Sequence, residues 1–404
     1  MRYDKPCLKC DWKHAFLMHD NYDHIFIDGL EMTAENVWNY EGSREALVDK
    51  LVDYFYNEGF KPWSDMSCED IEREVAKLFN ADPMSALDPE DGTLKNTSRL
   101  CLNVCRDFCQ ESFYATKVNG TPSILDVYKD KSLIERVLKN RLGWYTTTEP
   151  LELEDGTVLK GEHPYLFDIS HKMLVQGCHS SMVSANVSNF RPLVAKFLMS
   201  KFCPKLGKVL DMSMGWGARM LAAMSLGLDY YGIDPMTTED LKRLRAFVAS
   251  RKNLASLMLS MNPSLESKLV GGVSESIESY SSFPNSIDYA IVCPPYFKLE
   301  EYSCERSSTT SYADYSAWLN EYWKKTVDNA SSKMKIGAKL SLVMVEKWGK
   351  INLLKDMSNI IEQAGFSRVD ELSYKTTRSH LTDKRESSNN SKSTEKVATF
   401  EKMR

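Results

Sequence analysis

Apolar positions recur at two different periods along the chain, and the change of period divides it into two parts. Between residues 43 and 79 apolar side chains return every three or four positions, as in "REALVDKLVDYFYNEGF" and "CEDIEREVAKLF", which is typical of amphipathic helices. Ser67 precedes the second run and acidic residues follow it, so we expect Ser67 to cap that helix. Residues 96–118 predict one further helix, and residues 123–144 one or two more.

A hairpin is expected after these helices. The segment "TTTEPLELEDGTVLKGEHPYLF" is rich in threonine and places Glu-Asp-Gly between two short apolar runs. This pattern is typical of two antiparallel strands joined by a turn. Residues 1–184 are therefore expected to form a mostly helical accessory domain that includes the hairpin.

From about Asn189 onward short apolar runs alternate with helical patterns. Strands are expected at residues 208–214, 229–235, 267–274, 286–296, 338–345, 368–378 and 396–402, with single helices at, among others, residues 238–258 and 311–334. Such alternation predicts a doubly wound, Rossmann-like α/β sheet over residues 185–404. No helix separates the last two strands, so they are expected to pair as an antiparallel hairpin joined by the polar loop "SHLTDKRESSNNSKSTE".

Composition and charge indicate where the protein is located and which part of it would bind a charged partner. The chain has 404 residues, 43% of them hydrophobic, and no apolar run approaches the length of a membrane-spanning helix. Its first residues lack the order of a signal peptide, so we expect a cytoplasmic protein without a membrane partner. Residues 1–160 carry 19 Lys and Arg against 30 Asp and Glu, whereas the rest carries 32 against 26. A polyanion such as nucleic acid would therefore bind the second part.

The ten cysteines are expected to be thiols or metal ligands in that compartment rather than disulfides. Cys7 and Cys10, with His14 nearby, have the spacing of half a zinc site, and core thiols are the alternative. The cysteines of "CLNVCRDFC" lie four positions apart and predict one buried helix face: Cys101, Cys105 and Cys109.

Two expected strands end in residues suited to a nucleoside, at the edge where doubly wound sheets bind ligands. In "VLDMSMGWGARML", Gly215 and Gly217 let the backbone approach a ligand, and Asp211 could accept a hydrogen bond from an ammonium group or water. A glycine turn without a ligand is the alternative. In "YYGIDP", Asp234 suits a ribose diol or, alternatively, caps a helix whose first turn Pro235 would occupy.

A third strand ends in the segment "IVCPPYF". Two prolines at a strand end make a rigid elbow, because proline cannot donate to a sheet and excludes helix. An exocyclic amine is a poor nucleophile because its lone pair is delocalised into the ring. A carbonyl held by such an elbow can accept the amine hydrogens and so free the lone pair for attack.

Taken together and in this order, "DMSMGWGAR", "GIDP" and "CPPYFKLEEYS" resemble class I S-adenosylmethionine-dependent methyltransferases. More narrowly, they resemble the phage- and plasmid-type enzymes that methylate N6 of adenine or N4 of cytosine in DNA. The resemblance covers about residues 185–404 and implies S-adenosylmethionine as the cofactor. The implied cofactor-binding residues are Asn189, Arg191, Asp211, Met212, Ser213, Gly215, Trp216, Gly217, Asp234, Pro235 and Ser274. The implied catalytic elbow comprises Cys293, Pro294, Pro295, Tyr296 and Phe297.

The resemblance also implies roles within the elbow. Pro294 would present its carbonyl to the amine, and Tyr296 would stack on a base flipped out of duplex DNA. Cys293 departs from the Asp, Asn or Ser of the family, and a thiol is a weak acceptor. Three interpretations stay open: Pro294 and cofactor positioning suffice, the substrate is a modified base, or the domain binds without catalysing. The chemistry needs no metal.

We therefore expect methyl transfer to a base amine in DNA, with adenine N6 favoured over cytosine N4. RNA or protein amino-methylation and a cofactor-binding pseudo-enzyme are the alternatives. Residues 1–184 are a candidate recognition or dimerisation module. The segment after Glu300 is interpreted as a loop over the site or as a solvated connector. The loop before the last strand is interpreted as a phosphate-contacting arm or as merely soluble, with basic residues Lys375, Arg378, Lys384, Arg385 and Lys392.

Overall fold

The computed structural model of the protein describes residues 25–38, 40–63, 66–143, 146–147, 151–152, 158–159, 163–164, 168–297, 299–302, 310–375 and 394–404. The chain forms two compact units. Unit 1 comprises Met1–Asp65 and Tyr114–Val187, and unit 2 comprises Met66–Phe113 and Ser188–Arg404. The second junction lies close to the division expected at residue 185. In contrast to that expectation, residues 66–113 belong to the unit that contains the α/β sheet.

Unit 1 is mostly helical, with short strands. Its helices are α2 (Ala34–Trp38), α3 (Arg44–Glu58), α7 (Ile124–Val127), α8 (Lys131–Gly143) and α9 (His171–Ser180). Its strands are β1 (Phe26–Ile27), β2 (Leu30–Glu31), β3 (Lys117–Val118), β4 (Thr146–Thr147), β5 (Leu151–Glu152), β6 (Val158–Leu159) and β7 (His163–Pro164). The antiparallel pairs β4–β7 and β5–β6 confirm the expected hairpin.

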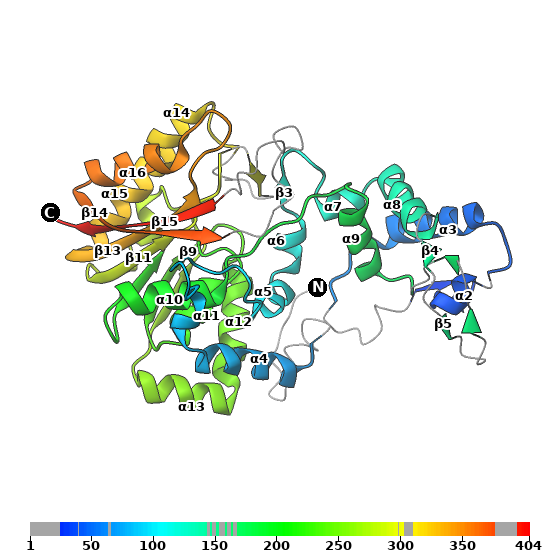
Figure 1. Cartoon of the computed structure of the whole chain (residues 1–404), viewed down its shortest axis with the longest axis horizontal. Helices are drawn as coiled ribbons and strands as arrows, with labels where there is room; N and C mark the ends of the chain where they lie inside the picture. Colours follow the sequence, from blue (N-terminus) through cyan, green and yellow to red (C-terminus); the bar gives the residue numbers. More distant parts are fainter. Residues whose placement is uncertain are drawn as a thin grey trace. The chain divides into compact units, whose positions relative to one another are not determined.

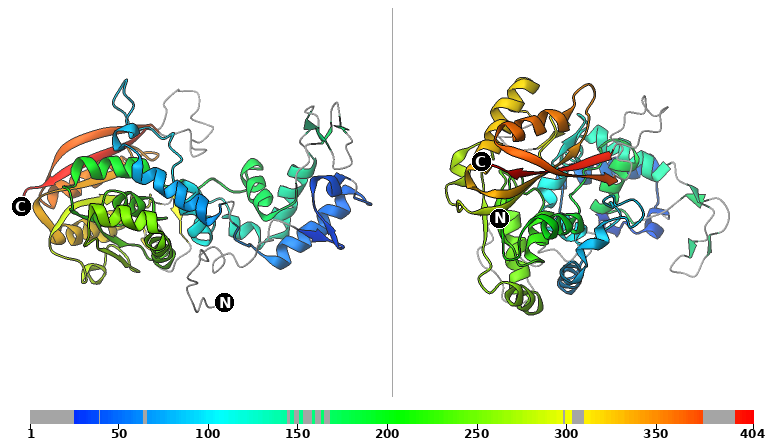
Figure 2. Two further views of the ribbon diagram at one scale, coloured as in Figure 1. Left: turned by 90° about the horizontal axis from the view of Figure 1, so that it is seen from below. Right: turned by 60° about the vertical axis from the view of Figure 1, so that its left-hand side comes forward.

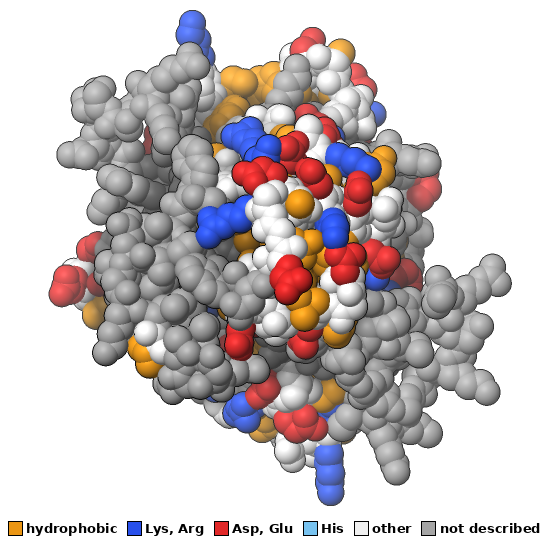
Figure 3. Space-filling model, turned by 90° about the vertical axis from the view of Figure 1, so that its right-hand side faces the viewer, with side chains coloured by type: hydrophobic (Ala, Val, Ile, Leu, Met, Phe, Trp, Pro, Cys, Tyr) orange, Lys and Arg blue, Asp and Glu red, His pale blue; other side chains and the backbone are white. Residues whose placement is uncertain are grey.

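Aromatic packing holds unit 1 together. The rings of Tyr128 and His171 stack with centroids 5.5 Å apart, and the Tyr128 hydroxyl lies 3.0 Å from Nδ1 of His171. Burial lowers the pKa of His171 to about 4, so the imidazole is neutral at pH 7. The face drawn in Figure 3 mixes both signs of charge. Lys131 and Asp53 form an exposed ion pair in this unit, at 2.6 Å.

Unit 2 is built on a seven-stranded sheet (Figure 1). Its strands lie in the order β10 (Ser267–Val270), β9 (Asp229–Ile233), β8 (Lys208–Asp211), β11 (Ile287–Val292), β13 (Met334–Val345), β15 (Thr394–Lys402) and β14 (Phe366–Lys375). The first five are parallel, and β15 is antiparallel to both β13 and β14. Figure 2 shows β14 and β15, in orange and red, as two long strands side by side. The expected Rossmann-like fold with an antiparallel last strand is confirmed.

Helices cover the sheet on both faces, as the strand–helix alternation predicts. Helix α10 (Pro192–Phe202) packs on α11 (Ala218–Met224), and α11 packs on β9, while α16 (Leu353–Gln363) packs on β13, β14 and β15 (Figure 1). Two expected single helices are interrupted. Residues 238–258 form α12 (Thr238–Ser250) and α13 (Lys252–Met261), which meet at extended Arg251. Residues 311–334 form α14 (Tyr315–Ala317), a π-helical turn over Trp318–Trp323, and α15 (Lys324–Lys333).

The inserted segment 66–113 holds α4 (Cys68–Asn80), a 3₁₀ turn over Pro83–Ala86, α5 (Leu102–Phe108) and the start of α6 (Gln110–Tyr114). Ser67 caps α4 as expected, since its hydroxyl accepts from the amide of Asp70 at 3.0 Å. The buried ammonium of Lys196 on α10 donates to the carbonyls of Leu78 and Phe79, at 2.8 and 2.9 Å. These two bonds satisfy carbonyls at the end of α4 and join the segment to α10.

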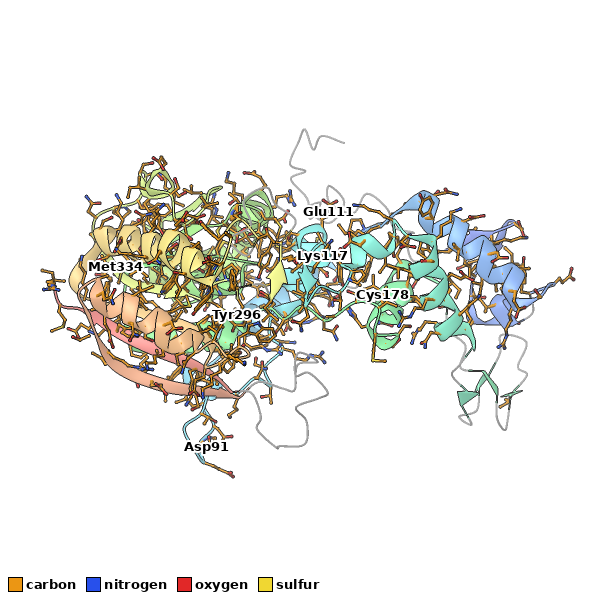
Figure 4. The ribbon with its side chains drawn as sticks, turned by 90° about the horizontal axis from the view of Figure 1, so that it is seen from above. Asp91, Glu111, Lys117, Cys178, Tyr296 and Met334 are labelled. Carbon is orange, nitrogen blue, oxygen red and sulfur yellow. The ribbon has the colours of Figure 1, made fainter. Side chains whose placement is uncertain are left out.

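The same segment also reaches the edge of the sheet. The amide of Leu94 donates to the carbonyl of Ser373 on β14 at 2.8 Å, and Asp91 lies at the tip of the loop that carries it (Figure 4). The single helix expected at residues 96–118 is instead α5 and α6, because Cys101 has a left-handed backbone and Cys109 ends α5. The expected buried stripe is confirmed, since Cys101, Cys105 and Cys109 are fully buried thiols. Among the described residues no helix is long and apolar enough to span a membrane.

Candidate active site

The three strand ends singled out in the sequence lie side by side. Strands β9, β8 and β11 are consecutive in the sheet and parallel, so the residues that follow them meet at one edge. Figure 4 shows Tyr296 at this edge, whereas Met334, the first residue of β13, lies at the opposite end of the sheet. Ligands of doubly wound sheets bind at the carboxyl edge. This edge is therefore the candidate active site.

Asp211, at the end of β8, is fully buried and paired. Its Oδ2 accepts from Nε of Arg219 and from the hydroxyl of Tyr230, both at 2.7 Å, and its Oδ1 accepts from the amide of Ser213 at 3.2 Å. Arg219 is likewise buried. Its pKa stays above the ordinary value because Asp211 outweighs the cost of burial. The carboxylate thus anchors the glycine loop from beneath.

The glycine loop, residues 212–217, needs both of its glycines. Gly215 and Gly217 have φ of +52° and +89°, and a Cβ at Gly217 would lie 2.7 Å from Leu241. Trp216 is buried between the rings of Phe113 and Tyr302, at centroid distances of 4.9 and 6.3 Å. Its indole N–H finds no acceptor within the described part of the chain. Buried donors are normally satisfied, so this one is available to a ligand or water.

Asp234, at the end of β9, binds the backbone around it. Oδ2 accepts from the amide of Gly215 at 3.1 Å, and Oδ1 accepts from the amides of Met236 and Thr237 at 2.9 and 3.0 Å. Burial raises the pKa of Asp234, and these N–H groups oppose that rise. Asp234 therefore organises the turn that leads into α12. The capping alternative is wrong in its residues, because the N-cap is Thr237 and the helix begins at Thr238, so exposed Pro235 precedes the first helical turn.

The elbow is tied to the glycine loop by its own backbone. The hydroxyl of Ser213 donates to the carbonyl of Cys293 at 3.0 Å, and the amide of Met212 donates to Ile291 at 3.4 Å. Pro294 is buried, while Cys293 and Pro295 are half-buried. Burial raises the pKa of the Cys293 thiol to about 12, so it is neutral at pH 7.

The two aromatic residues of the elbow point to different surroundings. The hydroxyl of Tyr296 donates to Oε1 of Glu395 at 3.3 Å. Phe297 instead packs among Tyr315 and Trp318, at centroid distances of 5.6 and 5.9 Å. Tyr296 thus contacts Glu395 at the carboxyl edge of the sheet, whereas Phe297 belongs to the core beneath α14.

Three further residues implied by the resemblance are engaged with protein groups. Asn189 lies beside the Cys105 thiol of α5, and Arg191 donates to the side chain of Asn96 in the inserted segment. The hydroxyl of Ser274 lies 3.1 Å from that of Thr326 on α15. Residues 66–113 therefore contact the stretch before α10 whose Asn189 and Arg191 were expected to bind the cofactor.

Two carboxyl groups at the site were missed by the sequence analysis as functional groups. Glu395, at the start of β15, lies at the carboxyl edge because β15 runs antiparallel to its neighbours. Glu300, in β12 (Glu300–Glu301), accepts a hydrogen bond from Tyr302. Burial raises the pKa of Glu395 to about 7 and also raises that of Glu300. The expectation of an antiparallel last strand contained the signal for Glu395, since such a strand must begin where parallel strands end.

Some predictions fall outside the described residues. They concern the zinc half-site of Cys7, Cys10 and His14, and the basic loop that includes Arg378 and Lys384. Among the described residues no group of three or more His, Cys, Asp or Glu could hold a metal ion.

No family model matches the chain, and no curated protein matches it. Solved structures do. TrmN from Thermus thermophilus aligns with 52% of this chain at 14% identity and a TM-score of 0.32, and the match spans 49% of that protein, about half its length. An rRNA methylase from Streptococcus thermophilus aligns with 54% of this chain and 100% of its own, at 15% identity and a TM-score of 0.30. A geranyl diphosphate methyltransferase with GPP and sinefungin aligns with 52% and 77%, at 11% identity and a TM-score of 0.34. Values this low carry neither activity nor substrate over to this chain.

Proposed function

We propose that the protein is an S-adenosylmethionine-dependent methyltransferase that methylates an exocyclic amine of a base in DNA, with adenine N6 favoured over cytosine N4. One observation carries the proposal: the glycine loop is bonded on one side to Asp234 and on the other to the elbow. The two contacts are Gly215 to Asp234 at 3.1 Å and Ser213 to Cys293 at 3.0 Å. A nucleoside cofactor and an amine substrate would thus be held by the same short loop, side by side.

The residues present fit such a cofactor. Oδ2 of Asp234 accepts one backbone hydrogen bond and keeps capacity for a second donor, such as a ribose hydroxyl. The left-handed glycines leave backbone uncovered, and the N–H of Trp216 is a donor that awaits an acceptor. S-adenosylmethionine supplies an electrophilic methyl group when bound. Asp211 would act on it indirectly, because its own charge is taken up by Arg219 and Tyr230.

The elbow fits an amine that projects from a flat ring. Pro294 is buried at a rigid backbone, so its carbonyl is a fixed acceptor for the amine hydrogens. Tyr296 is the aromatic residue of the elbow that contacts Glu395 at the carboxyl edge of the sheet, and it would stack on the base. A base in a duplex must leave the helix to reach such a wall, which favours a flipped nucleotide. DNA is accordingly the partner we propose.

The proposal is tested by supplying labelled S-adenosylmethionine with duplex DNA, RNA or protein, followed by mass spectrometry of the digested nucleosides. N6-methyladenine or N4-methylcytosine in DNA is the expected product. Label in RNA or protein would instead identify the protein as an RNA or protein amino-methyltransferase. Tight cofactor binding without any transfer would favour a pseudo-enzyme that recognises DNA or a protein partner, with unit 1 as a candidate recognition module.

A further inference from the structure

The antiparallel course of β15 brings a carboxyl group to the elbow from the far end of the sequence. Glu395 pairs in register with Val345, the last residue of β13, and with Tyr374 near the end of β14. Both neighbours lie where parallel strands finish. Glu395 therefore stands at the candidate site although it belongs to none of the three motifs.

Direct contact links this carboxyl group to the elbow. The hydroxyl of Tyr296 donates to Oε1 of Glu395 at 3.3 Å, which leaves Oε2 and the remaining lone pairs for other donors. Glu395 is half-buried, so one part of it is accessible. The Glu395 carboxylate also raises the pKa of the Cys293 thiol.

Cys293 itself cannot serve as the second acceptor of the elbow. Its thiol is neutral and a weak acceptor, and its carbonyl already accepts from Ser213 at 3.0 Å. An amine at the elbow would meet the Pro294 carbonyl and would lack the side-chain acceptor that Asp, Asn or Ser provides at the position of Cys293. A carboxylate that bonds Tyr296 of the same elbow can fill that place.

We propose that Glu395 is the side-chain acceptor for the substrate amine, in place of the residue that Cys293 replaces. The inference rests on the proposed function. In the step, the amine nitrogen uses its lone pair to form the new N–C bond and displaces sulfur together with the electron pair of the S–C bond. The same nitrogen passes one proton to the Glu395 carboxylate, which releases it to water. The step needs no reagent other than the amine, the cofactor and water.

Several titratable and charged groups face Glu395. They are Tyr296 and Cys293 of the elbow, Glu300 of β12, Tyr374 of β14 and Arg191 before α10. Burial and Glu300 raise the pKa of Glu395, while Tyr296 and Arg191 lower it, and the result is about 7. Only the ionised form can accept a proton, so transfer should rise with pH up to about 7 and then level off.

The decisive experiment is a rescue. Glu395→Gln should lower the single-turnover rate of transfer by about 10- to 100-fold, because the acceptor loses its charge, and should flatten the rise below pH 7. Cys293→Asp in the Glu395→Gln background should recover most of the rate, since it returns a carboxylate to the amine. Glu401→Gln is the matched control: it lies on the same strand, paired with Lys339 at 2.9 Å, and should leave the rate unchanged.

Two outcomes would overturn the assignment. One is an unchanged rate and pH profile in Glu395→Gln. The other is a loss that Cys293→Asp does not restore while Tyr296→Phe reproduces it in full, because Glu395 would then act only by orienting the tyrosine.

A second measurement needs no turnover. Alkylation of Cys293 by iodoacetamide, followed by peptide mass spectrometry across pH, reports the charge beside the thiol. Because Glu395 raises the pKa of Cys293, Glu395→Gln should speed alkylation several-fold at fixed pH. Equal rates of Cys293 alkylation in the wild type and in Glu395→Gln would show that Glu395 does not act on the thiol, and would overturn the inference. If alkylation responds but the wild type transfers no methyl group to any substrate, the proposed function fails while the juxtaposition stands.

Discussion

The carboxyl groups on the two sides of the candidate site differ in the hydrogen-bond donors that they meet. On the glycine-loop side, Asp211 is met by Arg219 and Tyr230, and Asp234 by three backbone amides. On the elbow side, the hydrogen bonds to Glu395 and Glu300 come from tyrosine hydroxyls. Amide and guanidinium donors favour the ionised form far more than a phenol does.

The difference indicates a division of labour. On the glycine-loop side the carboxyl oxygens are bonded to protein donors, which suits residues that hold the loop in place. On the elbow side burial raises the pKa of Glu395 to about 7, which is the range that the proton transfer proposed for it would require. Substitutions on the two sides should therefore separate binding from chemistry.

The largest effect is expected at Tyr296. Tyr296→Ala removes the stacking wall, so the rate of methyl transfer should fall by about 1000-fold or more, while the Kd for S-adenosylmethionine stays within about threefold. Radiolabel transfer and calorimetry give the two numbers. Tyr296→Phe keeps the ring and should retain much of the rate. If cofactor affinity falls together with the rate, the elbow and the glycine loop do not have separate roles in chemistry and binding.

Asp211 tests whether the glycine-loop side is anchored by its ion pair. Asp211→Asn leaves the buried Arg219 without its counter-ion, so the free energy of unfolding should fall by about 3 kcal/mol. Urea denaturation measures it. Asp328→Asn, in an exposed pair with Lys324 on α15, should cause no measurable change. If the two variants are equally stable, Asp211 does not anchor the loop.

Asp234 tests cofactor binding directly. Asp234→Ala removes the proposed ribose acceptor and loosens the turn before α12, so the Kd for S-adenosylmethionine should rise by about 30-fold. Glu239→Ala, on the first turn of α12, serves as the control in the same calorimetric assay. If Asp234→Ala binds S-adenosylmethionine as tightly as the wild type, Asp234 is not part of the cofactor site.

The smallest effect concerns the join between the inserted segment and α10. Burial lowers the pKa of Lys196 to about 8, so between about pH 8 and 10 the unfolded chain binds more protons than the folded one. The free energy of unfolding should therefore gain up to about 2 kcal/mol over this range from Lys196. Lys196→Met should remove that gain in urea denaturation at several pH values. An identical slope in both proteins would contradict a buried ammonium.

Local pattern predicted the sheet and the capped helix well, because these depend on neighbours in sequence. The seven strands of the sheet coincide with predicted apolar runs, and Ser67 caps α4 as its place before acidic residues indicates. Proximity of the glycine loop, Asp234 and the elbow followed from the rule that parallel strands end at one edge.

Long-range contacts could not be predicted in the same way. Nothing around Lys196 indicates that it binds the carbonyls of Leu78 and Phe79, about 120 residues earlier, so the membership of residues 66–113 in unit 2 was missed. The left-handed backbone at Cys101 interrupts residues 96–118, whose apolar pattern predicted a single helix. Such positions are decided by tertiary packing rather than by propensity.

The position of β15 has a consequence for how the unit assembles. This strand comes after every other strand of the sheet in sequence, yet it lies between β13 and β14. Within the described sheet β14 pairs with no strand other than β15, so before residues 394–402 are made it is held by α16 and by the bond between Leu94 and Ser373. A chain cut before residue 394 would lose an interior strand of the sheet and, with the same cut, the carboxyl group of Glu395 at the elbow.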